Sequence, residues 1–180
     1  MQFINLQEQY NQIQDRLNKN ILDTLKKGDF ILGKSVYDLE DSLSEYVGVK
    51  ECITCASGTD ALHLSLAALD IKPGDEVITT PFSFISTAWA ITYCGATPIF
   101  VDIDPKTFNI DPSEVEKAIT NKTKAIIPVH LFGQTADIEE LKLISKNNNI
   151  SIVEDCAQSF GAKVSDIQTG CFGEFGCFSF

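Results

Sequence analysis

Two adjacent carboxylates, Glu154 and Asp155, follow a short apolar run that begins at Ile150 and has the character of a buried parallel strand. Small and polar residues come directly after them, including Gln158 and Gly161. Open α/β sheets bind ligands beyond the carboxyl ends of their strands, so Asp155 occupies a place where a ligand is expected. A strand that ends in a solvated acidic turn is the alternative, and this stretch alone leaves both interpretations open.

The segment Ala56–Asp60, with the sequence ASGTD, comes directly before a predicted helix. Hydroxyl groups, a glycine that lets a ligand approach the backbone, and a helix amino terminus together favour the binding of a phosphate. The alternative is a simple helix cap, in which Ser57 or Thr59 satisfies helix amides. Neither GxxxxGK[ST] nor GxGxxG occurs, and the glycines that recur every third residue from Gly170 to Gly176 are interpreted as turn glycines.

Aromatic side chains and a histidine follow two further predicted strands. Pro81–Phe84 places aromatic rings where one could stack on a flat cofactor, although packing in the core is the alternative. His130 could line a pocket or cap the next helix, but a lone histidine provides neither a nucleophile nor a metal site.

Taken together, these residues fit a phosphorylated heteroaromatic cofactor. Pyridoxal 5′-phosphate (PLP) needs a carboxylate at its ring nitrogen, which keeps the ring protonated and electron-withdrawing. It also needs a stacking face and a phosphate site. Each signal is weak alone, but their order along one chain predicts PLP as the cofactor.

The elements that position these residues are predicted from the periodicity of apolar side chains. Apolar residues from Leu6 to Leu25 recur at spacings of three and four, which predicts a helix that ends near Gly28, and a second helix spans 35–47. Strands and helices then alternate, with strands at 52–55, 77–80, 97–101, 124–129, 150–154 and 175–180, and helices at 61–69, 85–93, 113–119 and 138–146. This alternation predicts an α/β fold with a mainly parallel sheet and no internal domain boundary.

Composition restricts the class of protein. The chain has 180 residues, a net charge of −11 and a pI of about 4.5, which argues against nucleic acid or an anionic membrane as a partner. No apolar run approaches a membrane span and the amino terminus lacks a signal-peptide pattern, so we expect a cytoplasmic protein. All six cysteines are expected to be reduced and buried, so no metal site is predicted, and zinc binding by cysteines such as Cys52 and Cys55 is the alternative.

Several blocks of the sequence resemble, in order, those of the DegT-type (DegT/DnrJ/StrS) sugar aminotransferases. These blocks are FINLQEQY, GDFILGKSVYDLE, ASGTDALHLSL, KPGDEVITTPFSFISTAWAI, GATPIFVDIDP, VHLFGQTADI, VEDCAQSFGA and GCFSF. The resemblance implies a fold-type I PLP-transferase large domain with helices on both faces of the sheet. Residues 1–48 would form its amino-terminal helices and residues 49–180 its sheet core, and the chain would be truncated before the small domain.

The resemblance also implies the roles of individual residues. Asp155 would pair with the pyridinium nitrogen, Gln158 would lie near the ring and its phenolic oxygen, and Phe84 would stack on the ring. Gly58, Thr59 and Ser179 would hold the phosphate, and Gly28 and Phe30 would border the sugar pocket. The family's catalytic lysine, which forms the Schiff base, is expected just after Phe180, so no catalytic residue is assigned within the chain.

The activity implied is transfer of an amino group, with glutamate as the expected donor, to a keto group of a nucleotide-linked sugar for surface polysaccharide or glycan synthesis. Blocks such as GDFILG and ITCASGTDAL are most similar to those of enzymes that aminate UDP-linked 3-keto sugars. The full-length protein is expected to form a homodimer, and the chain alone is expected to be inactive. Two alternatives remain: a PLP-dependent sugar dehydratase with His in place of Lys, and a non-catalytic remnant.

Overall fold

The computed structural model describes residues 4–180. The predicted domain and the first resembling block begin within residues 1–3, which lie outside that range. Five parallel strands form the main sheet in the order β2-β1-β3-β4-β7. They are β1 (Glu76–Thr79), β2 (Thr97–Phe100), β3 (Thr123–Ile126), β4 (Ser151–Asp155) and β7 (Phe175–Cys177). The fold class predicted from the sequence is therefore confirmed.

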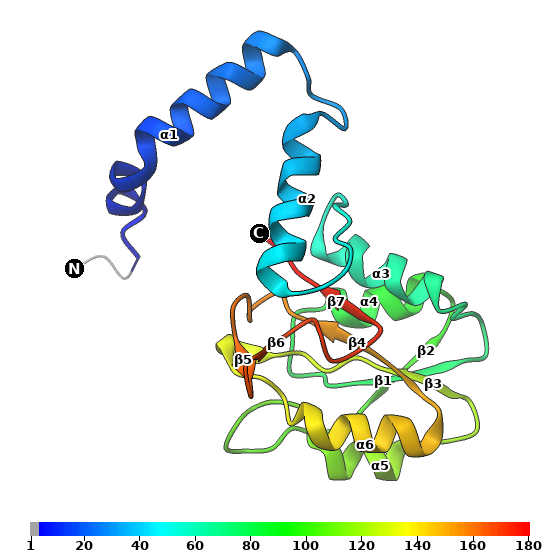
Figure 1. Cartoon of the computed structure of the whole chain (residues 1–180). Helices are drawn as coiled ribbons and strands as arrows, with labels where there is room; N and C mark the ends of the chain where they lie inside the picture. The colour runs from blue at the N-terminus through cyan, green and yellow to red at the C-terminus, as the bar shows by residue number, and fades with distance from the viewer. Residues whose placement is uncertain (1–3) are drawn as a thin grey trace.

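Helices cover both faces of this sheet, as Figure 1 shows. One apolar cluster joins α3 (Gly58–Ala68) and α4 (Ser86–Tyr93) to one face through residues such as Leu66, Ile91 and Val153. A second cluster joins α5 (Pro112–Ala118) and α6 (Ile138–Asn148) to the other face through residues such as Leu141 and Ile152. Val153 and Ile152 are neighbours in β4, so their opposite orientation reflects the alternation of side chains along a strand.

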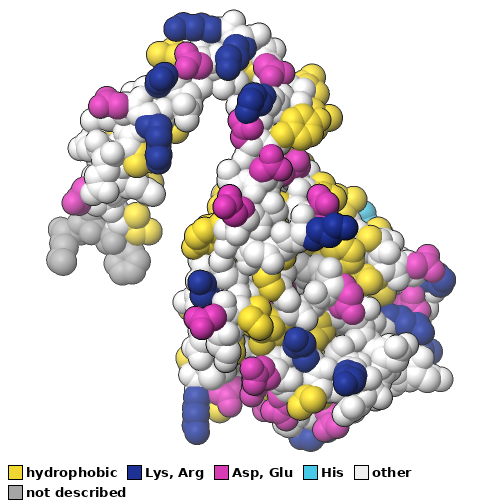
Figure 2. Space-filling view, viewed as in Figure 1, with side chains coloured by type: hydrophobic (Ala, Val, Ile, Leu, Met, Phe, Trp, Pro, Cys, Tyr) yellow, Lys and Arg dark blue, Asp and Glu magenta, His cyan; other side chains and the backbone are white. Residues whose placement is uncertain are grey.

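The amino-terminal helices extend away from the sheet. Helix α1 (Leu6–Lys27) ends at Gly28 in a left-handed conformation, as the sequence predicted, and α2 (Lys34–Val47) ends in the same way at Gly48. No residue of α1 is buried, and the predicted apolar face of this helix is at least partly exposed. Figure 2 shows hydrophobic side chains among charged ones along this arm. Between residues 4 and 180, no helix is long and apolar enough to cross a membrane.

Short elements complete the chain. A two-stranded antiparallel hairpin, β5 (Lys163–Val164) and β6 (Ile167–Gln168), lies between β4 and β7 and was not predicted. A single turn of 3-10 helix, Leu131–Gly133, follows β3.

The predicted strand at 52–55 is wrong, since these residues form no strand in the described structure. Instead, the side chain of Glu40 in α2 accepts hydrogen bonds from the N–H and the hydroxyl of Thr54, at 2.7 and 2.8 Å. A groove of about 1160 Å³, lined by residues of α2, the 48–57 segment, α3 and β7, borders this segment. A strand needs a neighbour for its backbone groups, and this segment has none within residues 4–180.

The prediction that all six cysteines are buried is also wrong. All six are free thiols, but only Cys156 and Cys177 are buried, whereas Cys55 is exposed. Cys156 and Cys177 lie in or next to strands of the sheet, and Cys55 lies in the segment that forms no strand.

Ile126 of the central strand β3 is fully buried, so Ile126→Ala in the full-length protein should leave a cavity in the core. We expect the free energy of unfolding to fall by about 2–5 kcal/mol, measured by urea denaturation. Leu143→Ala provides the control, because Leu143 on α6 is 63% exposed. Equal loss of stability in the two variants would contradict this description of the core.

Candidate cofactor site

The site lies beyond the carboxyl ends of the parallel strands. Strand β1 pairs with β2 on one side and with β3 on the other, so the strand order reverses between β1 and β3. Ligands of open α/β sheets bind at such a reversal. The segments after β1 and β3 supply Phe84 and His130 at this edge of the sheet, and the last residue of β4 is Asp155.

Asp155 is the last residue of β4 and is only 5% exposed. Its Oδ2 accepts a hydrogen bond from the Thr87 hydroxyl at 2.8 Å, and its Oδ1 accepts one from the Ala157 N–H at 3.2 Å. Burial raises the pKa of Asp155, and the bonds from Thr87 and Ala157 oppose that shift only in part. The two hydrogen bonds thus fix the orientation of the carboxylate. Its burial makes the negative charge unfavourable unless a positive group lies next to it.

The predicted phosphate site lies at the amino terminus of α3. The Ser57 hydroxyl oxygen caps this helix by accepting a hydrogen bond from the Asp60 N–H at 3.2 Å, so the capping alternative holds for Ser57. The N–H groups of Gly58 and Thr59 in the first turn have no partner within the helix. Gly58 packs against the segment after β7, because a Cβ built on it would lie 2.8 Å from the Cβ of Ser179. Three predicted phosphate ligands, Gly58, Thr59 and Ser179, therefore come together.

Helix α4 joins the phosphate site to Asp155. The Thr59 hydroxyl donates a hydrogen bond to the Ser86 hydroxyl at 2.8 Å, and the next residue, Thr87, donates to Asp155. Both α4 residues are buried. The sequence analysis missed Ser86 and Thr87, although their position shortly after the predicted aromatic segment was a usable signal.

Gln158 is held by the loop that follows β3. Its side-chain Oε1 accepts a hydrogen bond from the Phe132 N–H at 2.9 Å, which leaves the amide NH₂ group to act as a donor elsewhere. Phe132 has a φ of 56°, a left-handed conformation that is strained for a bulky residue and that often marks functional sites.

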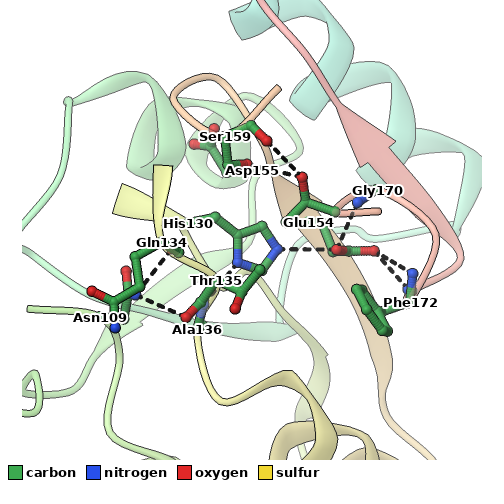
Figure 3. Close-up of polar contacts among 12 residues, drawn as sticks. Asn109, His130, Gln134, Thr135, Ala136, Glu154, Asp155, Ser159, Gly170 and Phe172 are labelled. Atoms are coloured by element: carbon green, nitrogen blue, oxygen red, sulfur yellow. Dashed lines mark hydrogen bonds and ion pairs between the residues drawn. The ribbon is translucent and has the colours of Figure 1, made fainter. Parts of the chain in front are cut away.

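Glu154 faces away from Asp155 and lies at the centre of a buried network, drawn in Figure 3. Its Oε1 accepts hydrogen bonds from the N–H groups of Phe172 and Gly173, at 2.7 and 2.9 Å. Its Oε2 accepts one from the Gly170 N–H at 2.8 Å and lies 3.0 Å from Nε2 of His130. The carboxylate therefore connects β4 to two separate loops.

The tautomer of His130 follows from its second contact. The Ala136 N–H donates to Nδ1 at 3.0 Å, so Nδ1 carries a lone pair and the ring proton lies on Nε2, which donates to Glu154. Burial acts to raise the pKa of Glu154, but the hydrogen bonds from His130, Gly170 and Gly173 outweigh burial and hold that pKa below its ordinary value. Glu154 is thus an ionised carboxylate next to a neutral imidazole.

The side-chain ligand atoms of His130, Glu154 and Cys156 lie within 4.8 Å of one another, as in many metal sites. However, a metal on Nε2 of His130 would move the ring proton to Nδ1, where the Ala136 N–H already points. We therefore describe this group as a hydrogen-bond network.

Three other predicted residues are less constrained by the structure. Phe84 lies between β1 and α4 and is 72% exposed, so its ring is free to contact a ligand. Gly28 and Phe30 lie in the junction between α1 and α2, away from the carboxyl edge of the sheet (Figure 1). The described structure does not bring these two residues to the other predicted site residues, so their role in a sugar pocket stays a prediction.

The residues present fit PLP. The amino terminus of α3 offers the N–H groups of Gly58 and Thr59 to a phosphate, and the segment after β7 offers the Ser179 hydroxyl. The absence of a side chain at Gly58 leaves room for that phosphate. Asp155 offers a buried carboxylate to a ring nitrogen, and Gln158 offers a donor to the phenolic oxygen. The N–H donors for the phosphate lie at α3, and the carboxylate for the ring nitrogen is Asp155. Both ends of the site are joined to α4, through Ser86 and Thr87.

Comparison with known proteins gives a consistent result. The UDP-2-acetamido-2-deoxy-3-oxo-D-glucuronate aminotransferase of Pseudomonas aeruginosa is 46% identical over the whole chain, which covers 50% of that enzyme. A crystal structure of a DegT/DnrJ/EryC1/StrS aminotransferase from Brucella abortus matches the whole chain with a TM-score of 0.97 and 41% identity, and the chain covers 50% of it.

A putative sugar aminotransferase from Streptococcus pneumoniae, solved in its PMP form, matches 90% of the chain with a TM-score of 0.85 and 36% identity. The chain covers 45% of that structure. The same protein has also been solved in its PLP form, so this relative binds PLP and its amino form, pyridoxamine 5′-phosphate (PMP). The chain spans about half the length of the curated relatives it matches.

Residues 11–180 match the DegT/DnrJ/EryC1/StrS aminotransferase family. This range includes all five strands of the parallel sheet. The chain therefore belongs to the DegT/DnrJ/EryC1/StrS aminotransferase family.

Proposed function

We propose that this chain is the cofactor-binding part of a PLP-dependent aminotransferase that acts on a nucleotide-linked keto sugar. The observation that carries the proposal is the hydrogen-bonded connection from the phosphate site at α3, through Ser86 and Thr87, to the buried carboxylate of Asp155. The identity with the Pseudomonas aeruginosa enzyme supports a UDP-linked 3-keto sugar as the acceptor. Glutamate is the amino donor we propose.

When bound, PLP supplies an electron sink that stabilises negative charge on the carbon next to the transferred nitrogen. The residues of this chain have three tasks toward it. Asp155 would hold the proton on the ring nitrogen, and its fixed contact with Thr87 keeps one carboxylate oxygen in place. Gly58, Thr59 and Ser179 would bind the phosphate and so fix the distance of the ring from α3.

Gln158 and Phe84 would set the tilt of the ring. Because the Gln158 Oε1 is committed to the Phe132 N–H, its NH₂ group would donate to the phenolic oxygen. Phe84 would cover one face of the ring and exclude water from it. Gly28 and Phe30 would border the sugar in the complete protein, which we propose to be a homodimer that serves polysaccharide synthesis.

The function is tested by incubating the full-length protein with PLP, ¹⁵N-labelled glutamate and a UDP-linked 3-keto sugar. Mass spectrometry should detect an amino sugar that carries ¹⁵N. Loss of water from the sugar without incorporation of nitrogen would instead identify a dehydratase. Absence of both products, with no bound cofactor, would refute the proposal.

Asp155→Ala in the full-length protein should lower turnover by about 10²-fold or more, because the ring nitrogen loses the carboxylate that stabilises its proton. Initial rates of amino-sugar formation provide the measurement. Asp166→Asn is the control, since Asp166 lies exposed between β5 and β6 and takes no part in the site. Turnover near that of the wild type in Asp155→Ala would exclude this role for Asp155.

Gly58→Val should weaken cofactor binding on the order of tenfold or more, because the added side chain would meet Ser179 and fill the phosphate site. Isothermal titration with PMP measures the dissociation constant, and the thermal midpoint reports folding. Ala67→Val adds similar bulk at an exposed position of the same helix and should bind PMP normally. If Gly58→Val binds PMP as tightly as the wild type does, the phosphate lies elsewhere.

A further inference from the structure

The end of β4 buries two carboxylates, and in the described part of the chain no lysine or arginine forms an ion pair with either of them. Glu154 is fully buried and Asp155 nearly so. Within residues 4–180, the lysine ion pairs involve other acidic residues, all of them at least partly exposed, and the only ion-pair partner of Glu154 is His130. The Ala136 N–H donates to Nδ1 of His130, so the imidazole in this arrangement has its single proton on Nε2 and adds no positive charge.

Among residues 4–180, no cationic side chain from the elements packed around Glu154 forms an ion pair with it other than His130. The titratable groups near it are His130 after β3, Cys156 after β4, Cys171 in the loop before β7, and Cys177 in β7. Asp155 points to the opposite face of the sheet. Burial raises the pKa of each of these thiols above its ordinary value, so they stay protonated and uncharged.

Four hydrogen-bond donors, three of them backbone N–H groups, nevertheless keep Glu154 ionised. Backbone and imidazole donors stabilise an anion but leave its net charge unchanged. A net negative charge therefore remains inside the sheet, one residue from the carboxylate that would meet the cofactor. Buried charges interact more strongly than exposed ones, because little water screens them.

We propose that Glu154 is a second, ionised carboxylate of the cofactor site, which acts from behind Asp155 to hold a protonated ring nitrogen. This inference rests on the proposed function, because it requires a cofactor with a basic ring nitrogen at Asp155. Glu154 does not touch the ring in this arrangement. It is a positioning residue that acts through its charge and through the two loops that it fixes.

The sign of the effect follows from electrostatics. A nearby negative charge stabilises the protonated form of a ring nitrogen and raises the pH at which the proton is lost. Removal of the charge at Glu154 should lower that pH. A purely structural role for Glu154 predicts no such dependence on its charge.

The experiment uses the full-length protein with PMP labelled with ¹⁵N at the ring nitrogen, whose chemical shift reports protonation. In Glu154→Gln, the midpoint of the titration should fall by about one pH unit, the effect of one buried charge at an effective dielectric constant near 20. Glu154→Asp keeps the charge and shortens the side chain, so its midpoint should stay close to that of the wild type.

Glu174→Gln is the matched control. Glu174 is exposed in the segment before β7, and its Oε2 accepts a single hydrogen bond from the Ile152 N–H at 2.7 Å, which an amide oxygen can also accept. This variant should titrate like the wild type. A Glu154→Gln midpoint equal to that of the wild type would overturn the inference, as would equal shifts in Glu154→Gln and Glu154→Asp.

Two further results separate the inference from the proposed function. A wild-type protein that binds no PMP, or binds it with an unprotonated ring nitrogen at low pH, would refute the proposed function itself. If Glu154→Gln does not fold, ¹³C NMR of the glutamate carboxyls in the wild type replaces it. Glu154 should then stay ionised from roughly pH 5 to 9, and uptake of a proton in that range would overturn the inference.

Discussion

The burial of two consecutive carboxylates at the end of β4 is the constraint on which this site depends. Side chains alternate along a strand, so Glu154 and Asp155 must face opposite sides of the sheet. An ionised carboxylate away from water is very unfavourable unless donors surround it. Glu154 has its full set of donors within the protein, whereas Asp155 has two and lies next to the site where a ligand would bind.

The donors that Glu154 requires come from segments far apart in the sequence, and this fixes the shape of the site. One loop reaches it from between β6 and β7 through Gly170 and Gly173. The other follows β3 and is itself held by Asn109, whose side chain accepts from the Leu131 N–H and donates to the carbonyls of Gln134 and Thr135. This loop contains Phe132, whose N–H binds the side chain of Gln158. The loop is therefore anchored before any ligand binds, and such preorganisation favours specific binding.

Periodicity was sufficient to predict most of the fold. The strand at 150–154 and the helix at 138–146 were recognisable because their apolar residues repeat at the spacing of the element they form. The segment 52–55 was predicted wrongly because only its local composition was used. That composition suits a strand, but a strand also needs a neighbouring strand, which the local sequence does not specify. Asp155 was identified because its place at a strand end has a known consequence.

The remainder of the site depends on contacts that periodicity does not encode. His130 and Glu154 are 24 positions apart, and no pattern in the sequence indicates that they meet. The orientation of Glu154 could have been predicted, because residues two apart in a strand point to the same face. Glu154 therefore shares the face of Ile152, opposite that of Asp155. Gly173, interpreted as a turn glycine, lies where a side chain would collide with the backbone of Ile152, so its absence of a side chain lets the loop approach Glu154.

A crystal structure of the full-length protein with PMP tests the central claim most directly. The ring nitrogen should lie about 2.7–3.2 Å from a carboxylate oxygen of Asp155, with the phosphate at the N–H groups of Gly58 and Thr59. A cofactor bound elsewhere, or one whose ring nitrogen faces away from Asp155, would contradict the account.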